Sequence, residues 1–259
     1  MTWFNRLHLP AIGTISVSLE IVLAASCCAP VRAQLAPEAH SAAVRLNPII
    51  HFEPPPGEGQ PTGNRSGGNR DCFSATTSDN AVDRAFLTLL IPETLQGFTI
   101  DERPTVFVYI PQTSARSVRA KLEDEAGNLY YYNENLPISE TPGIYAFRFP
   151  SSTPSLEAGQ RYQWTMAVTC REASRYDDPS VSGWIERIEP DLALDRSDRE
   201  PSLELAASYA ADGLWFDALT TLAELRQSQP NNPTVTREWE TLLDSIGLAG
   251  IATQPLRSN

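Results

Sequence analysis

Histidine, cysteine and carboxylate side chains are the groups with which chemistry could begin in this chain of 259 residues. The three histidines, His8, His40 and His51, all precede residue 72, ahead of the region that we expect to fold. Without a histidine in that region, a Ser-His or Cys-His nucleophile and a histidine zinc site are not expected. No glycine loop has the strand-to-helix context of a phosphate cradle. The sequence therefore predicts no catalytic residue, no metal site and no cofactor.

Carboxylates gather in two places, Tyr-Asp-Asp-Pro at 176–179 and Asp-Arg-Ser-Asp at 195–198. A pair of carboxylates could serve a glycosidase or a calcium site. Neither cluster has the spacing of a calcium loop, so we expect both to be solvated turns. A carboxylate-dependent hydrolase therefore stays open only as a third hypothesis.

Aromatic side chains offer two candidate binding groups. Tyr130, Tyr131 and Tyr132 follow one another and could stack on a sugar, although strand alternation would turn one or two of them into the core. Tyr209, Trp215 and Trp239 lie further along the chain and could contact a protein partner, with core packing as the competing interpretation.

Residues 1–33 have the form of a secretory signal peptide, with an apolar stretch from Leu9 to Ala25 and a small-residue cleavage pattern ending at Ala33. A membrane anchor is a rival interpretation, but Glu20 interrupts the apolar stretch, which falls short of the roughly 20 residues that a span needs. A lipoprotein is a second rival interpretation, because Cys27 or Cys28 could carry a lipid. No later segment approaches spanning length. We expect export to the periplasm or the exterior.

Cleavage after residue 33 would leave two cysteines, Cys72 and Cys170, which are 98 positions apart. In an exported protein such a pair is a natural disulfide, and two unpaired thiols are the alternative.

The net charge is −12, from 20 basic and 32 acidic side chains, and cleavage would deepen it to −13. Such a chain repels the phosphates of nucleic acids and anionic lipids. We therefore expect another exported or cell-surface protein as the partner, rather than nucleic acid.

Apolar and polar residues alternate with a period of two through much of the region between Cys72 and Pro190, the pattern of half-buried strands. Turn residues separate the segments, and the segment 106–110 is apolar on both faces, as a central strand would be. We expect strands at 86–91, 106–110, 117–123, 129–133, 145–149, 161–170 and 181–188.

This pattern predicts an immunoglobulin- or fibronectin-like antiparallel β-sandwich over residues 72–190. A Pro- and Gly-rich leader, expected to be flexible, precedes it over 34–71. The run Leu-Glu-Ala-Gly-Gln-Arg-Tyr at 156–162 resembles the strand entry of fibronectin type III domains, in which the tyrosine hydroxyl bonds to nearby backbone.

Residues 191–259 change to a helical pattern. The matching positions resemble a single tetratricopeptide repeat of about 34 residues, followed by a third helix near 234–245. They are Leu205, Ala206, Tyr209, Gly213, Trp215, Ala218, Leu222 and Pro230. Because one such repeat cannot bury its own faces, it must pack on its third helix, on the sandwich or on a partner.

Read end to end, residues 65–255 are similar to a cyanobacterial family known as domain of unknown function 928. The resemblance is carried by LTLLIP at 87–92, PTVFVYIP at 104–111, GWIER at 183–187 and GLWFDALTTLAELR at 213–226. It implies an exported protein with no assigned activity and transfers no catalytic residue.

Our leading hypothesis is an exported, non-enzymatic interaction or adaptor protein. The alternatives are a carbohydrate-binding module for cell-wall or extracellular polysaccharide and, third, the hydrolase.

Overall fold

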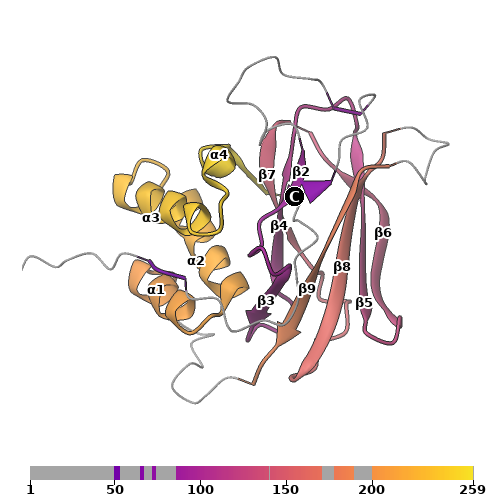
Figure 1. Cartoon of the computed structure of the whole chain (residues 1–259), viewed down its shortest axis with the longest axis horizontal. Coiled ribbons are helices and arrows are strands. Elements are labelled where there is room, and N and C mark those ends of the chain that lie inside the picture. The colour runs from indigo at the N-terminus through magenta and orange to yellow at the C-terminus, as the bar shows by residue number, and fades with distance from the viewer. Residues whose placement is uncertain are drawn as a thin grey trace, which may run out of the picture. The chain divides into compact units, whose positions relative to one another are not determined.

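The computed structural model describes residues 50–52, 65–66, 72–73, 86–139, 141–170, 178–189 and 200–258. The expected signal peptide, most of the leader and the acidic cluster at 195–198 lie outside these residues. The described part of the chain is a mixed α and β structure with two sheets and four helices (Figure 1). All of it belongs to one compact unit, Leu46–Asn259.

The first sheet has the strand order β1-β2-β4-β7-β10 and the second has the order β3-β9-β8-β5-β6. The strands of the first sheet are β1 (Arg65–Ser66), β2 (Leu87–Leu89), β4 (Thr105–Ile110), β7 (Gly143–Arg148) and β10 (Leu256–Ser258). Those of the second are β3 (Gln96–Thr99), β5 (Ser117–Asp124), β6 (Leu129–Pro137), β8 (Gln160–Val168) and β9 (Ser180–Arg187).

The alternation read from the sequence is confirmed in the strands that carry it. In β5, Val118, Ala120 and Leu122 are buried while the residues between them are half-buried. Strand β4 is buried at every position, as expected for a central strand. Side chains of both sheets line one small cavity, so the apolar faces of the two sheets are turned toward each other.

The expectation of purely antiparallel sheets is wrong at two edges. Strand β3 pairs in parallel with β9, and β10 pairs in parallel with β7. Both are short edge strands that arrive from another layer: β3 follows a strand of the first sheet, and β10 follows the helices. Strand β10 was not predicted, because three residues are too few to show a period.

The helices are α1 (Leu203–Ala211), α2 (Trp215–Ser228), α3 (Pro233–Asp244) and α4 (Ala249–Ala252). Helix α1 begins after Ser202, whose hydroxyl accepts the backbone N–H of Leu205 at 3.1 Å. Gly213 has φ +74°, a left-handed conformation that glycine adopts without strain, and it makes the turn from α1 to α2. Asn232 caps α3, with Pro233 at the first helical position.

Helix α2 packs on β3 and β4, so the helices and strands share one hydrophobic core. The indole nitrogen of Trp215 donates to the carbonyl of Leu90 at 2.9 Å. The ring of Phe216 lies so close to Gly97 that a Cβ there would be 2.6 Å from the ring. The helical hairpin therefore buries its apolar side against the sheets.

Candidate functional site

The disulfide predicted between Cys72 and Cys170 is present, with 5.3 Å between the two Cα atoms. It fixes the end of β8 to the short segment around Cys72, whose carbonyl accepts the hydroxyl of Thr113 at 2.7 Å. The expected acidic cluster at 176–179 is described only from Asp178. That carboxylate is buried, and it accepts Arg119 at 3.1 Å and the backbone N–H of Cys170 at 3.2 Å. Asp178 therefore connects strand β5, through Arg119, to the backbone at the disulfide.

The three consecutive tyrosines lie on β6, an edge strand of the second sheet. Tyr130 packs edge-on against Tyr162 with 4.9 Å between ring centroids, and Tyr131 packs against Phe149 at 5.5 Å. Tyr132 is 46% exposed, and its hydroxyl donates to Glu134 at 2.8 Å. Of the three candidate glycan-binding residues, Tyr132 is exposed, whereas Tyr130 and Tyr131 are half-buried.

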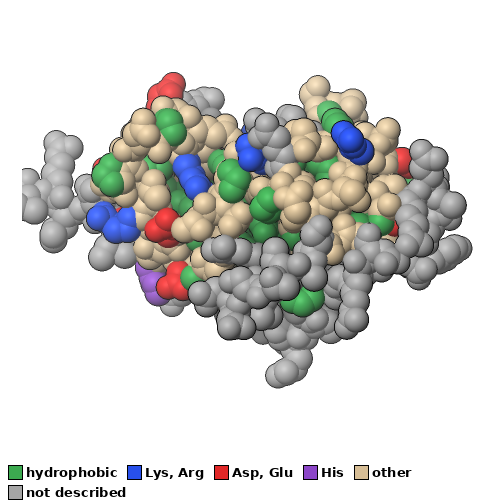
Figure 2. Space-filling model, turned by 90° about the horizontal axis from the view of Figure 1, so that it is seen from above, with side chains coloured by type: hydrophobic (Ala, Val, Ile, Leu, Met, Phe, Trp, Pro, Cys, Tyr) green, Lys and Arg blue, Asp and Glu red, His purple; other side chains and the backbone are tan. Residues whose placement is uncertain are grey.

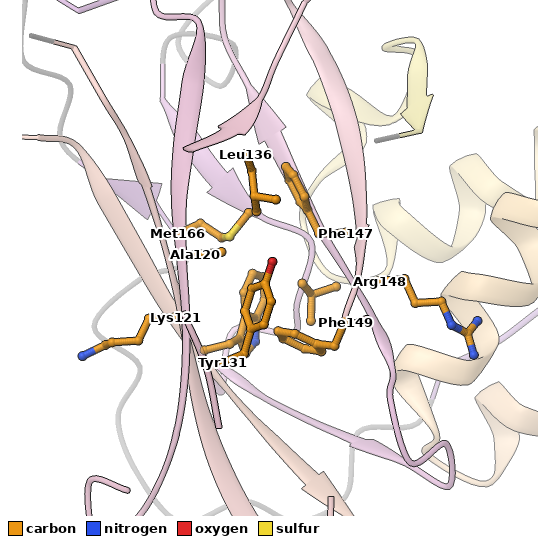
Figure 3. A pocket seen from close by; sticks show the side chains of 10 residues that line it. Ala120, Lys121, Tyr131, Leu136, Phe147, Arg148, Phe149 and Met166 are labelled. Carbon is orange, nitrogen blue, oxygen red and sulfur yellow. The ribbon is translucent and has the colours of Figure 1, made fainter. Parts of the chain in front are cut away.

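A small cavity lies behind Tyr131, between the sheets (Figure 3). Its volume is about 30 Å³, which is room for about one water molecule. Leu136, Phe147 and Met166 extend into it, while the charged ends of Lys121 and Arg148 point away (Figure 3). A sugar could not enter this space.

A larger hollow, of about 560 Å³, is lined by charged residues; we name it the charged cleft. Its lining residues are Asp101, Glu102, Arg103, Arg148, Phe149, Pro150 and Ser151.

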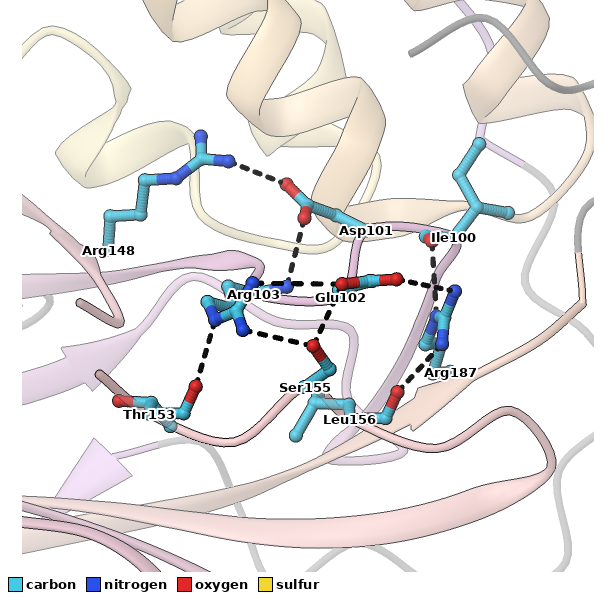
Figure 4. A network of polar contacts seen from close by, with 9 residues as sticks. All are labelled: Ile100, Asp101, Glu102, Arg103, Arg148, Thr153, Ser155, Leu156 and Arg187. Carbon is cyan, nitrogen blue, oxygen red and sulfur yellow. Dashed lines mark hydrogen bonds and ion pairs between the residues drawn. The ribbon is translucent and has the colours of Figure 1, made fainter. Parts of the chain in front are cut away.

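The polar groups of the charged cleft are largely engaged with one another (Figure 4). Arg148 pairs with Asp101 at 3.0 Å. Arg103 donates to the carbonyl of Thr153 at 2.9 Å and to the hydroxyl of Ser155 at 3.0 Å. Arg103 thus clamps the loop after β7 onto the turn after β3.

Helix α2 brings a further carboxyl group next to this turn. Asp217 accepts the backbone N–H of Ile100 at 3.3 Å and is also hydrogen-bonded by the side chain of Thr99. Burial raises the pKa of Asp217 from 3.8 to about 7, and the negative charge of Asp101 adds to the rise. Burial also raises the pKa of Glu224, one heptad further along α2, although Arg148 opposes that shift. Asp217 can therefore gain or lose a proton near neutral pH.

The aromatic residues proposed for partner contact are in the core. Tyr209 is 6% exposed, and Trp215 and Trp239 are fully buried. The Trp239 indole nitrogen donates to the carbonyl of Ala252 at 2.9 Å. The three residues therefore lie where the competing interpretation, core packing, places them.

Part of the expected flexible leader is packed against the helices. Ile50 and Phe52 are buried, and His51 between them is exposed. The backbone N–H of Ile50 donates to the carboxylate of Glu238 at 2.9 Å. The Phe52 ring meets the Trp215 ring edge-on at 4.8 Å between centroids. These three residues of the expected leader are thus held against the helices by two buried apolar side chains.

The sequence model of one protein family, described as Domain of Unknown Function (DUF928), matches residues 65–256. The chain belongs to the DUF928 family. No curated protein and no solved structure matches it. The DUF928 match includes every described helix and strand from β1 to α4 and the first residue of β10, whereas Ile50 to Phe52 lie before its first residue.

Within the described residues of this DUF928 protein, no group of three or more His, Cys, Asp or Glu side chains could hold a metal ion. None of the described helices is both long and apolar enough to cross a membrane. On the face in Figure 2, charged side chains are scattered and neither sign forms a continuous patch.

Sequence reasoning missed Asp217 and Glu238. Asp217 sits in the first turn of α2, where an acidic residue is ordinary, so its type gave no signal. Glu238 could have been noticed, because it falls on the apolar stripe of α3 that contains Val235, Trp239 and Leu242. A charge on such a stripe needs a partner, and here the partners are the Ile50 N–H and Arg237.

Proposed function

We propose that this DUF928 protein is an exported, non-enzymatic adaptor that binds another exported or cell-surface protein through strand β6. The observation that supports this is the exposure of Leu129 (58%) and Tyr132 (46%), the large exposed hydrophobic residues of the described chain. Both lie on β6, at the edge of the second sheet among the described residues. An edge strand offers backbone groups to an added strand, and exposed apolar side chains add specificity.

Four features of the chain favour this role. The signal-like segment and the disulfide suit an exported protein. The hydrogen bond from the Glu157 backbone N–H to the Tyr162 hydroxyl, at 2.9 Å, supports the fibronectin-like interpretation of the sheets. The α1–α2 hairpin, turned at Gly213, supports the tetratricopeptide-like interpretation. Fibronectin-like sheets and tetratricopeptide-like hairpins are both scaffolds on which binding surfaces are commonly built.

The test is affinity capture from periplasm and culture medium with full-length protein carrying Leu129→Lys, which places a charge on the strand edge. The matched control is Gln112→Lys, which adds the same charge on an exposed loop. We expect the wild-type protein and Gln112→Lys to recover the same partner and Leu129→Lys to lose it. Equal recovery by all three would contradict binding through β6.

A carbohydrate-binding role is the second candidate, and Tyr132 favours it. Its ring is exposed, Glu134 accepts its hydroxyl, and the opposite strand position holds Lys121, which is paired with Glu123 at 2.7 Å. An exposed ring bordered by polar groups is the arrangement that stacks on a sugar. Glycan arrays should show binding that Tyr132→Ala abolishes and that Gln112→Lys leaves unchanged; absence of glycan binding by the wild-type protein excludes this role.

A carboxylate-dependent hydrolase is the third candidate, supported by Asp217 and Asp101. Burial raises the pKa of Asp217 to about 7, and the neighbouring Asp101 is paired with Arg148, so two carboxyl groups in different environments lie near each other, as acid–base catalysis requires. Asp217→Asn should then abolish release of reducing sugars from polysaccharide. Polysaccharide left intact by the wild-type protein excludes the role.

A further inference from the structure

The short segment that packs against the helices has the form of a bound peptide. Ile50 is 1% exposed and Phe52 is 4% exposed, while His51 between them faces solvent. This alternation of buried and exposed side chains is that of an extended chain lying on a surface. In Figure 1 the segment runs alongside α1 as a separate indigo stretch.

Two fixed groups of the helical unit hold the segment. Glu238 on α3 is 1% exposed, and one of its carboxylate oxygens accepts the Ile50 backbone N–H at 2.9 Å. The other oxygen is paired with Arg237 at 3.2 Å. Trp215 at the start of α2 receives the Phe52 ring edge-on. A buried carboxylate that accepts a backbone N–H recognises the peptide chain itself, and the apolar contacts select the side chains.

The site and its occupant come from different parts of the chain. Glu238 and Trp215 lie within the residues that match the family, and Ile50 to Phe52 lie outside them. Nineteen residues separate Phe52 from Cys72, where the disulfide next fixes the chain. The backbone of the described segment is joined to the helices by the charge-assisted hydrogen bond from the Ile50 N–H to Glu238. Replacement of the segment by another peptide would therefore leave the disulfide and the sheets in place.

We propose that α2 and α3 form a site for an extended peptide with the pattern aliphatic, any residue, aromatic. Ile50 to Phe52 occupy this site in cis, and a partner protein's segment of the same pattern replaces them. The proposal rests on the adaptor role but uses a surface other than β6, so each can fail without the other.

The test uses full-length protein with Ile50→Ala and Phe52→Ala, which removes both anchoring side chains; we name it the emptied variant. The probe is a fluorescent peptide of residues 46–53 in which the exposed His51 is replaced by Gln, Leu-Asn-Pro-Ile-Ile-Gln-Phe-Glu. Fluorescence polarisation should show the probe binding the emptied variant at least about tenfold more tightly than the wild-type protein, whose site is filled. A probe with Ala at the two anchor positions is the matched control and should not bind.

Glu238→Leu, added to the emptied variant, keeps the bulk of the side chain but has no oxygen to accept the N–H; it should weaken probe binding by about tenfold or more, the usual cost of losing a hydrogen bond to a charged group. Two results would overturn the proposal: a folded emptied variant that does not bind the probe, or one that binds the alanine control equally well. Loss of β6-dependent capture, by contrast, leaves the outcome of this assay unchanged.

If the emptied variant does not fold, hydrogen exchange on the wild-type protein tests whether the segment can be replaced by the probe. The Ile50 amide should be protected, and excess probe should release it, because the probe takes its place on Glu238. An Ile50 amide that exchanges as fast as that of a free peptide, or one that stays protected at saturating probe, refutes the exchangeable site.

Discussion

Replacement of Asp217 by asparagine should make the protein more stable at pH 8. The Asp217 carboxyl accepts the Ile100 N–H next to the charged cleft, and its pKa rises from 3.8 to about 7. Asparagine keeps a carbonyl oxygen to accept that N–H, but it carries no charge that burial would penalise. The variant therefore removes the cost of ionising the carboxyl group in the folded protein.

The size of the effect follows from the shift in pKa. Each unit corresponds to about 1.4 kcal/mol, so a rise of this size sets an upper limit of about 4 kcal/mol. Asp217 is half-buried, and its place in the first turn of α2 favours the ionised form, which offsets part of the penalty. We expect Asp217→Asn to raise the free energy of unfolding at pH 8 by about 2 kcal/mol.

The effect should depend on pH with a definite sign. A carboxyl group with a raised pKa binds its proton more tightly in the folded state than in the unfolded state. Its contribution to stability is therefore present at low pH and is lost as the pH rises through about 7. The difference between the variant and the wild-type protein should be near zero at pH 4 and should grow to its full value above pH 7.

Urea denaturation followed by tryptophan fluorescence at several pH values measures this difference. Asp212→Asn, which changes an exposed carboxyl group after α1, is the control and should show no such trend. A difference between Asp217→Asn and the wild-type protein that does not change with pH, or a variant less stable at pH 8, would refute the reasoning.

Three other substitutions test the packing. Replacing Cys72 and Cys170 by alanine opens a 98-residue loop and should cost about 4 to 5 kcal/mol of unfolding free energy in urea; a midpoint unchanged from that of the oxidised wild-type protein would contradict this. Asp178→Ala leaves a guanidinium group without its buried partner and should cost about 3 kcal/mol in thermal melts, whereas a neutral result would show that the pair is dispensable. Gly97→Ala forces a methyl group against the Phe216 ring and should cost about 1 to 3 kcal/mol; a stability equal to wild type would mean that the ring can move aside.

The strands were predictable wherever a segment was long enough to show its period. Strands β5 and β8, of eight and nine residues, were read with the correct buried face, and the turn at Gly213 was placed correctly. Strand β10, of three residues, left no pattern to read. The disulfide was predictable because Cys72 and Cys170 are the two cysteines that follow the expected signal peptide.

The candidate surfaces were harder to predict, because they depend on contacts between segments far apart in the sequence. The sequence does not show that the sheets cover α2, so Trp215 could be interpreted as a residue that contacts a partner. In the structure its indole N–H donates to the carbonyl of Leu90, 125 positions earlier. Ile50 and Phe52 looked like linker residues because their neighbours are polar and rich in proline. No local pattern links Ile50 to Glu238, which lies 188 positions later.

The parallel pairing of β10 with β7 makes the first sheet depend on the last residues of the described chain. Strand β7 is made more than a hundred residues before β10 and, in the described structure, has β4 on its other side. Until β10 is in place, the β7 edge of the first sheet is unpaired, and an unpaired edge recruits strands from other chains. Truncation after the helices would make that temporary state permanent, so we expect such shortened chains to aggregate.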